Sequence, residues 1–335
     1  MSLVSDSSSA ESAKKTAENI SGVDQKRSTL FNLPRNVYIL LVFTMGKGFQ
    51  LSIAALNLNL YVHSLGYQPD FVGIFSAMPA LGAMVGAVPT GLLSDRIGRK
   101  PVLMMTALLT PIVLALVGLA TAAPMLLALN FVQGLVSTAY WVTNLPLLTE
   151  NTTQRQRVGV LALNSFLLLG IGALGNLLGG AVPELVAGMM HVPANSAEPL
   201  RWGVFLAASF TLIFGLPLWF LQEKKRESAV RGERLQRSES VVAKTGEMPV
   251  ARVRSQVKPQ APVLLFAQLL VPDLLFTMGE GAVVALIQLF FVLRFSLLPG
   301  SLGVIFTISG LAGGIFSLTA PLFVKRWSKL RIVTT

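Results

Sequence analysis

Two charged residues lie inside apolar stretches of the chain, where a charge is costly. Lys47 stands in Gly46-Lys47-Gly48 and Glu280 stands in Gly279-Glu280-Gly281, each within a run long enough to cross a bilayer. A charge near the centre of a membrane helix costs about 2.5–3.5 kcal/mol on insertion scales, so such residues commonly mark a solute or ion pathway. We therefore expect Lys47 and Glu280 to meet across a central cavity, directly or through a solute. A static structural ion pair and an unrelated placement are the alternatives.

Neutral polar side chains within the apolar stretches are further candidates for contact with a solute or a coupling ion. They are Gln50, Asn57 and Asn59 in the first stretch, Gln133, Tyr140, Trp141 and Asn144 in the fourth, Asn164 and Asn176 in the fifth, and Gln288 in the seventh. Hydrogen bonds between packed helices explain each of them as well. Because these neutral groups outnumber the charges, they favour a neutral or amphiphilic solute.

The elements that must position these residues are membrane-spanning helices. The chain has 335 residues, of which 53% are hydrophobic and 13% charged, and it has no cysteine. This composition indicates a polytopic membrane protein and excludes a soluble or disulfide-stapled domain. Eight apolar runs of sufficient length predict eight spans, which we expect over residues 36–62, 71–93, 101–122, 125–148, 158–182, 202–221, 272–294 and 301–324.

The polar segments divide these spans into two groups. Residues 1–33 are polar and lack an apolar core, so we expect a disordered tail. Residues 34–222 would form a six-helix half, residues 223–262 a basic linker, and residues 263–335 a partial second half with two helices. The linker is best explained as a solvated tether near anionic lipid headgroups, and regulatory binding of a lipid or a partner is the alternative.

The basic residues predict the orientation of the chain. A net charge of +11 is compatible with binding of nucleic acid, but in a membrane protein the basic residues must first be assigned to the loops on each side of the membrane. Of the 27 Lys and Arg residues, Arg201 and Arg294 alone fall in loops on one side, and Lys47 lies within the first span. All others fall in the tail and in loops on the other side, which places the N-terminus in the cytoplasm and requires no nucleic-acid partner.

Between the second and third predicted spans, ten residues read Gly91-Leu-Leu-Ser-Asp95-Arg96-Ile-Gly98-Arg99-Lys100. We expect Gly91 to permit close helix approach, Gly98 to permit a tight turn, and Asp95 to cap a helix N-terminus or pair with arginines. The segment resembles the loop signature of the major facilitator superfamily, G-x-x-x-D-R-x-G-R-K, and matches every fixed position. The resemblance implies an all-α helical bundle and a secondary carrier that works by alternating access.

The same resemblance implies that this segment is a cytoplasmic latch between the two halves. Its residues would be Gly91, Asp95, Arg96, Gly98, Arg99 and Lys100, with Glu150 as the partner of Arg96 or Arg99; a solvated acid is the alternative for Glu150. Members of the superfamily have twelve spans, whereas this chain ends just after the eighth. We therefore expect a product truncated after the eighth helix, and a genuine eight-span protein is the alternative.

Two weaker likenesses concern coupling and direction. Asn130-Phe-Val-Gln133-Gly134 resembles a pattern R-x-x-Q-G whose arginine is associated with proton coupling, but Asn130 replaces that arginine. Gly175-Asn176-Leu-Leu-Gly179-Gly180 is similar to the signature G-P-x-x-G-G of antiporters, with Asn176 in place of the proline. The first likeness leaves coupling to a proton or another ion open. The second favours efflux over uptake, although packing of small residues explains the same glycines.

The sequence therefore predicts transmembrane transport of a small solute by a secondary carrier of the cell membrane. A non-transporting membrane protein, such as a sensor, an assembly partner or a degenerate carrier fragment, is the alternative. We expect no enzyme, because no H-E-x-x-H motif and no paired carboxylates within one span are present. Catalytic residues, metal ligands and organic cofactors are accordingly not predicted, and the expected partners are the solute, membrane lipid and a coupling ion.

Overall fold

The computed structural model describes residues 33–222 and 286–319, and this part of the chain contains helices and no strand. Seven of its helices are long and apolar enough to cross a membrane, which confirms an all-α membrane protein. They are α2 (Arg35–Ser64), α3 (Pro69–Ile97), α4 (Arg99–Leu119), α5 (Ala123–Glu150), the continuous helix α6 (Gln154–Ser165), η1 (Phe166–Ile171) and α7 (Gly172–Met190), then α8 (Ala197–Gly215) with η2 (Leu216–Phe220), and α11 (Pro299–Ser317). A shorter apolar helix covers Leu286–Phe295.

Proline and one polar cap set where several helices begin. A proline stands in the first turn of α3, α5 and α11, where its missing N–H breaks no helical hydrogen bond. Helix α6 begins instead at Thr153, which forms a reciprocal capping box with Gln156. Short connections join the spans from α2 to α8, so each of these spans runs antiparallel to the one before it.

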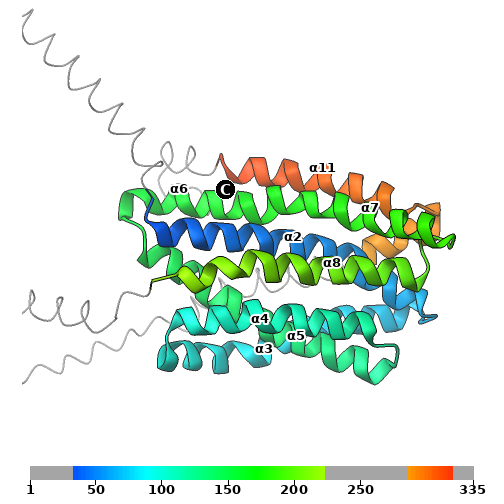
Figure 1. Ribbon diagram of the computed structural model, residues 1–335, viewed down its shortest axis with the longest axis horizontal. Coiled ribbons are helices and arrows are strands. Elements are labelled where there is room, and N and C mark those ends of the chain that lie inside the picture. Colours follow the sequence, from blue (N-terminus) through cyan, green and yellow to red (C-terminus); the bar gives the residue numbers. More distant parts are fainter. Residues whose placement is uncertain (1–32, 223–285, 320–335) are drawn as a thin grey trace, which may run out of the picture. The chain divides into compact units, whose positions relative to one another are not determined.

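Helix α2 occupies the interior of the bundle, between α7 and α8 (Figure 1), and packs against both. Its contact with α7 depends on two glycines. A Cβ atom at Gly48 would lie 2.4 Å from the carbonyl oxygen of Leu168, and one at Gly172 would lie 2.7 Å from the Cα of Gly48. The two backbones therefore touch directly, which fixes the height of Lys47 relative to α7.

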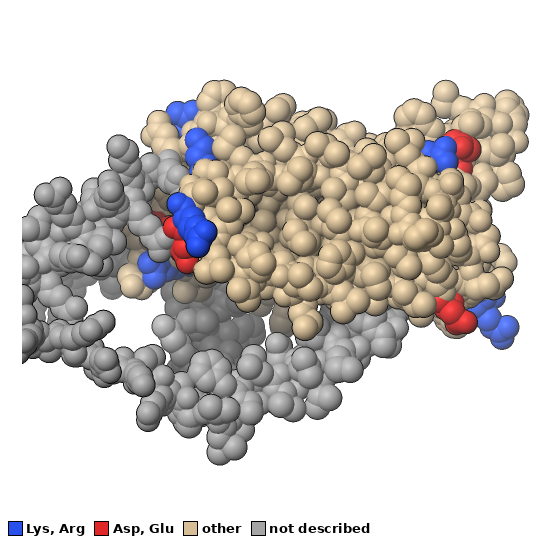
Figure 2. All heavy atoms as spheres, turned by 90° about the horizontal axis from the view of Figure 1, so that it is seen from below, with Lys and Arg blue, Asp and Glu red and all other residues tan. Residues whose placement is uncertain are grey.

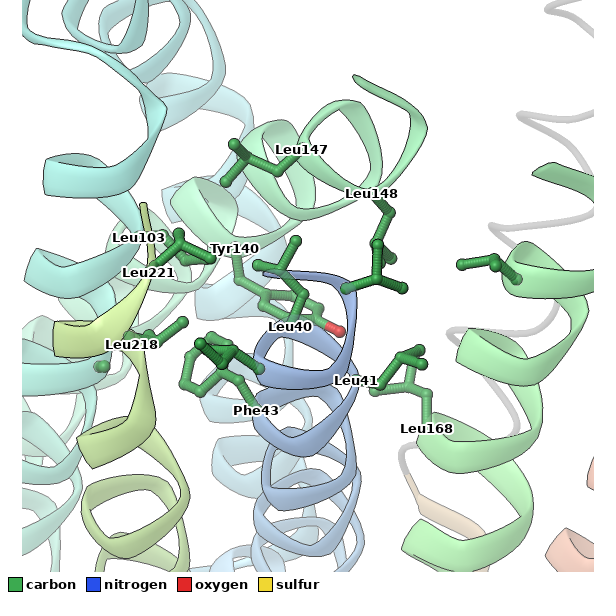
Figure 3. Packing of buried hydrophobic residues seen from close by; sticks show 14 of the residues in the cluster. Leu40, Leu41, Phe43, Leu103, Tyr140, Leu147, Leu148, Leu168, Leu218 and Leu221 are labelled. Atoms are coloured by element: carbon green, nitrogen blue, oxygen red, sulfur yellow. The ribbon is translucent and has the colours of Figure 1, made fainter. Parts of the chain in front are cut away.

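A hydrophobic cluster fills the interior at the end of the bundle where α2 begins. Figure 3 shows side chains from α2, α4, α5, η1 and η2 converging around Phe43 and Tyr140. The rings of Phe43 and Tyr140 meet edge to face with centroids 5.8 Å apart, an arrangement that adds to the stabilisation from burial. The cluster holds these five elements together directly beside the polar groups of α2 and α5.

Large apolar side chains also cover the outer surface. Met84 is 78% exposed, Val88 is 70% exposed and Ile308 is 65% exposed. A soluble monomer rarely exposes so many large apolar groups, whereas lipid tails accept them without cost. Figure 2 shows the complementary charge pattern, because the described charged residues on that face gather at the two ends and leave the side between them bare.

The first six predicted spans coincide with long apolar helices, but the fifth differs in length and form. It was expected over 158–182, whereas the helical segment continues to Met190 and contains a π-helical turn at Phe166–Ile171. The helix ends where His191 adopts the left-handed conformation, with φ 54°. Extra length of this kind is accommodated in a membrane by tilting or kinking.

The last two predicted spans are only partly described. Of the expected span 272–294 the structure describes a helix over Leu286–Phe295, and the eighth begins at Pro299, two residues before its expected start. Glu280, nearly all of the tail 1–33, the linker 223–262 and the end of the eighth span lie outside the described residues. The division of the chain into these segments therefore stays a prediction.

Candidate functional site

The segment from Gly91 to Lys100 is mostly helical rather than a loop. Helix α3 continues to Ile97 and α4 begins at Arg99, so Gly98 alone separates them. Gly98 has φ 94°, a backbone conformation that favours glycine and makes the sharp reversal possible. The expected tight turn at Gly98 is therefore present.

The structure contradicts one expectation for this segment, the capping of a helix by Asp95. Asp95 lies in the last turn of α3 and does not cap α4, whose N-cap is Gly98 without any side-chain hydrogen bond. The reason is that α3 is longer than expected and carries Asp95 and Arg96 on its exposed end. A Cβ atom at Gly91 would meet no atom of the described residues within 4 Å, so close helix approach does not explain this glycine there.

The bases at the start of α4 connect three helix ends. Arg99 Nη1 lies 2.5 Å from Glu150 Oε1 at the end of α5, and Lys100 Nζ donates a hydrogen bond of 3.4 Å to the carbonyl oxygen of Trp219 in η2. The Arg99 side chain is 22% exposed and that of Glu150 is 55% exposed. We call this end of the bundle the Arg99 end. The charge pair that the sequence indicated for Glu150 is thus formed with Arg99, within the first six spans.

A buried polar cluster lies deeper in the bundle, formed by Thr44 of α2, Tyr140 and Asn144 of α5, and Asn164 of α6. Thr44 Oγ1 donates to Asn164 Oδ1 at 2.8 Å, and the Tyr140 hydroxyl donates to Thr44 Oγ1 at 3.3 Å. Asn144 Nδ2 lies 3.2 Å from Thr44 Oγ1, 3.2 Å from the Tyr140 hydroxyl and 3.3 Å from Asn164 Oδ1. In Figure 3 the Tyr140 hydroxyl points toward α2. The cluster therefore links three spans through side chains alone.

Lys47 lies one helical turn beyond Thr44 on α2. It is completely buried, and its Nζ atom has no hydrogen-bond partner among the described residues. Nζ lies 5.8 Å from the centroid of the Tyr140 ring, within the range of a cation–π contact. Gln50, a further turn along, is 2% exposed, and its Oε1 atom likewise accepts no hydrogen bond from the described residues. The structure thus places Lys47 beside the ring of Tyr140, a member of the polar cluster, with Gln50 one turn farther along α2.

Other predicted cavity residues are engaged in helix packing. Asn57 donates to the carbonyl oxygens of Ile53 and Gly179, which ties α2 to α7. Gln133 donates to Ser137 within α5. Trp141 is 48% exposed and contacts the Tyr140 ring from outside. Asn176 and Gln288 are buried, and neither makes a hydrogen bond to Lys47, whose Nζ atom has no partner among the described residues. These five residues are therefore not gathered into the site around Lys47.

The part of the chain that the structure describes has no group of three or more His, Asp or Glu residues able to hold a metal ion. The polar cluster consists of hydroxyl, amide and ammonium groups, which suit a solute better than a divalent cation. Thr44 belongs to this cluster, although nothing in the sequence distinguishes it from other threonines in the spans. A threonine within an apolar helix commonly bonds to its own backbone, so its type alone carries no signal.

The sequence matches known membrane carriers. Solute carrier family 22 member 2 of Rattus norvegicus is 30% identical over 155 residues, which are 46% of this chain and 25% of that protein. Major facilitator-type transporter psiT2 of Psilocybe cyanescens is 33% identical over 133 residues, or 37% and 25% of the two chains. Solute carrier family 22 member 11 of Homo sapiens is 28% identical over 275 residues, or 78% and 45%.

A solved structure shows the same fold. It is a bacterial homologue of the human lysosomal transporter Spinster in an inward-facing, unoccupied conformation, with a TM-score of 0.58 and 12% sequence identity. The match covers 88% of this chain and 64% of that one. Of the three carriers matched by sequence, the chain spans 25%, 25% and 45% of the length. The sequence model of the Major Facilitator Superfamily matches residues 38–335, and the chain therefore belongs to this superfamily.

Proposed function

We propose that the protein is a secondary carrier that moves a small solute across the membrane by alternating access. The observation that carries this proposal is the buried ammonium group of Lys47, which has no hydrogen-bond partner among the described residues. A charge within a membrane helix is costly and persists where it serves a pathway. In a member of a carrier superfamily, the simplest such role is contact with a solute or a coupling ion.

The solute site would consist of Lys47, Gln50, Tyr140 and Asn144. These side chains come from α2 and α5, and hydrogen bonds to Thr44 and Asn164 hold Tyr140 and Asn144 in place. In carriers built from repeated halves, substrate sites lie near the bilayer midplane between the halves. Glu280, on the predicted seventh span, would face this site from the second half, and its meeting with Lys47 stays a prediction.

We assign the Arg99 end to the cytoplasm of the cell and the N-terminus to the same side. The charge distribution supports this orientation, because the loops on that side hold nearly all bases of the sequence. Arg99 and Lys100 would then act as a cytoplasmic rim that holds the ends of α4, α5 and η2 together. The predicted latch between the halves would form on this rim, with Asp95 and Arg96 exposed at its edge.

Coupling and direction rest on weaker support. Asn130 donates a hydrogen bond of 2.7 Å to the carbonyl oxygen of Phe75 and so serves the packing of α5 on α3. Gly175 and Gly180 lie against the backbones of α2 and α11. Packing thus accounts for both motifs that touch on proton coupling and efflux. We propose efflux as the direction of transport to be tested first. A proton or another ion would be the coupling ion.

Alternating access is testable without knowledge of the solute, because the chain has no cysteine. A Gln50→Cys variant in oriented vesicles would be treated with a membrane-impermeant thiol reagent from either side. A carrier exposes this position to each side in turn, so labelling from both sides is expected. Ser196→Cys, in the connection before α8, is the control and should react from one side only. Labelling of Gln50→Cys from one side or neither would favour a non-transporting membrane protein.

A further inference from the structure

Lys47 is the one charged side chain that the described residues bury completely. No carboxylate among these residues lies within ion-pair distance of it, since the described ion pairs join Arg99 to Glu150 and Arg201 to Glu198. The polar cluster next to it is neutral, and its hydrogen bonds are made internally. A charged ammonium group in such surroundings is unfavourable unless an anion pairs with it.

The groups around Lys47 also indicate the shape of a ligand. The ring of Tyr140 makes edge-to-face contacts with those of Phe43 and Trp141, with centroids 5.8 Å and 5.1 Å away. The Tyr140 ring gives the ammonium group an apolar, aromatic neighbour, and Phe43 packs against this ring within the buried cluster. Gln50 and Asn144 each keep one oxygen without a hydrogen-bond donor among the described residues, so the site also accepts hydrogen bonds.

We infer that the solute is an organic monoanion whose carboxylate or similar group pairs with Lys47 while its apolar body lies against the Tyr140 ring. This inference rests on the proposed carrier function and names its substrate class. An anion at this position gains a charge-assisted hydrogen bond in a low dielectric, which is the strongest contact that the site offers. The competing occupant is the protein's own Glu280, which would leave the wild-type site closed to anions.

Three probes of nearly equal shape separate these outcomes: benzoate, benzamide and benzamidinium differ in charge but share one planar ring. Binding to the purified 335-residue chain would be measured by thermal shift and microscale thermophoresis. We expect benzoate to stabilise the protein at concentrations at which the other two do not. Lys47→Met should abolish the benzoate effect, and Lys47→Arg should retain part of it, since the guanidinium keeps the charge.

Lys47→Met is a suitable variant because an apolar side chain of similar length replaces a buried charge, an exchange that is often neutral for folding. Arg294→Gln, an exposed base outside the site, is the matched control and should bind benzoate as the wild type does. A stronger effect of benzamide or benzamidinium would overturn the inference. So would benzoate binding that survives Lys47→Met, or that appears only after Glu280→Gln. The labelling of Gln50→Cys from two sides uses no anion, so the carrier proposal stands or fails separately.

A second, independent observation concerns the opposite end of the bundle, where α7 ends and α11 begins. We call it the Glu184 end. Gly300 in the first turn of α11 donates its backbone N–H to Glu184 Oε1 at 2.9 Å. A Cβ atom at Gly300 would lie 2.5 Å from Glu184 Oε2, and one at Gly180 would lie 2.4 Å from the carbonyl oxygen of Pro299. The carboxylate is thus fitted against the N-terminus of α11, where a negative charge is stabilised.

This contact joins the fifth span to the eighth, which the sequence assigns to different halves. Farther along α7 and α11 the two helices stay close. The Thr307 hydroxyl donates to the carbonyl oxygen of Ala173, and a Cβ atom at Gly303 would lie 2.3 Å from the carbonyl oxygen of Asn176. Apart from Glu184, the contacts described along this seam are made by small residues and neutral groups, which let the two backbones approach closely. We infer that Glu184 is the residue that holds the Glu184 end closed during transport.

Distance measurements between spin labels test this role in the cysteine-free chain. Labels at Met189→Cys and Ser301→Cys report the separation of α7 and α11 at the Glu184 end. Glu184→Ala should shift the distribution toward longer distances, and Glu184→Gln should shift it less, since its amide oxygen still accepts from Gly300. Glu198→Ala removes another acid near this end and is the matched control. Unchanged distances in Glu184→Ala, or an equal shift in Glu198→Ala, would overturn the inference.

Discussion

Tyr140 combines two contacts that single substitutions can separate. Its hydroxyl donates to Thr44 and accepts from Asn144, while its ring faces the ammonium group of Lys47. Tyr140→Phe removes the hydroxyl only. We expect it to lower the free energy of unfolding by about 1–3 kcal/mol, because Asn144 and Thr44 lose a partner in a buried place. Benzoate affinity should change little, since the ring stays.

Tyr140→Leu removes both the hydroxyl and the ring, so it should lose stability as Tyr140→Phe does and lose benzoate affinity in addition. An aromatic pair contributes about 0.5–1.5 kcal/mol beyond its buried area, so the affinity for benzoate should fall about 2- to 10-fold. Chemical denaturation and thermophoresis on both variants give the comparison. Equal losses of affinity in Tyr140→Phe and Tyr140→Leu would show that the hydroxyl, and not the ring, supports the ligand.

The pair of Arg99 and Glu150 should matter more for function than for stability. Both side chains are partly exposed, and pairs of this kind contribute only about 0–1 kcal/mol. The free energy of unfolding of Glu150→Gln should therefore lie within about 1 kcal/mol of the wild-type value. The same substitution should change the rates at which Gln50→Cys is labelled from each side of the membrane. The exchange Arg99→Glu with Glu150→Arg should restore those rates. Failure of the double variant to recover would argue that Arg99 acts through another contact.

At the scale of single residues, the sequence predicted which residue types matter better than it predicted which residues they contact. An apolar setting makes Lys47 conspicuous, and the match of Gly91 to Lys100 identifies the bases of the rim. Whether an asparagine serves packing or a site depends on which helix face it occupies and what lies opposite. Asn57 reaches the backbone of α7, whereas Asn144 reaches Thr44 and Asn164. Glu184 was not selected, because the predicted fifth span ended two residues before it.

Among the elements, α2 is the one whose position decides the site, and its glycines fix that position. A methyl group at Gly48 would collide with the backbone of η1 and α7, so Gly48→Ala requires a backbone shift. We expect a loss of about 1–3 kcal/mol in stability, as is usual for overpacking, and a displaced Lys47. Thermal unfolding together with benzoate binding measures both effects.

Gly73→Ala is the matched control for this prediction. Gly73 lies within α3, and a Cβ atom there meets no atom of the described residues within 4 Å. Alanine favours a helix interior over glycine by about 0.8–1 kcal/mol, so this variant should be as stable as the wild type or more so. If both alanine variants behave alike, direct backbone contact does not position α2.

Hydropathy located these elements well, because a helix in a membrane needs an apolar run of fixed length. It could not predict the π-helical turn at Phe166–Ile171, which inserts no polar residue and leaves the apolar pattern intact. That turn lies where Gly48 meets Leu168 and where Gly170 meets Gly314. Its position is thus set by contacts with α2 and α11, which lie far away in the sequence.

For the whole molecule, different kinds of contact join the helices at the two ends of the described bundle. At the Arg99 end, bases connect helix ends to one another within the first six spans. At the Glu184 end, a single carboxylate connects the fifth and eighth spans. A carrier must open its two ends alternately. The pair of Arg99 and Glu150 at one end and the part-buried contact of Glu184 with the α11 backbone at the other are separate, so one can be released without the other.

The orientation of the molecule gives a last prediction, because every proposal about the two ends depends on it. Bases concentrate on one side of the predicted spans, and this bias sets the topology of short loops. Thr153→Cys, before α6 at the Arg99 end, should therefore react with an impermeant thiol reagent only after intact cells are made permeable. Ser196→Cys, at the Glu184 end, should react in intact cells. The reverse pattern would place the Arg99 end outside and would turn the proposed cytoplasmic rim into an external one. Labelling of both positions in intact cells would contradict the assignment of Thr153 and Ser196 to opposite sides of the membrane.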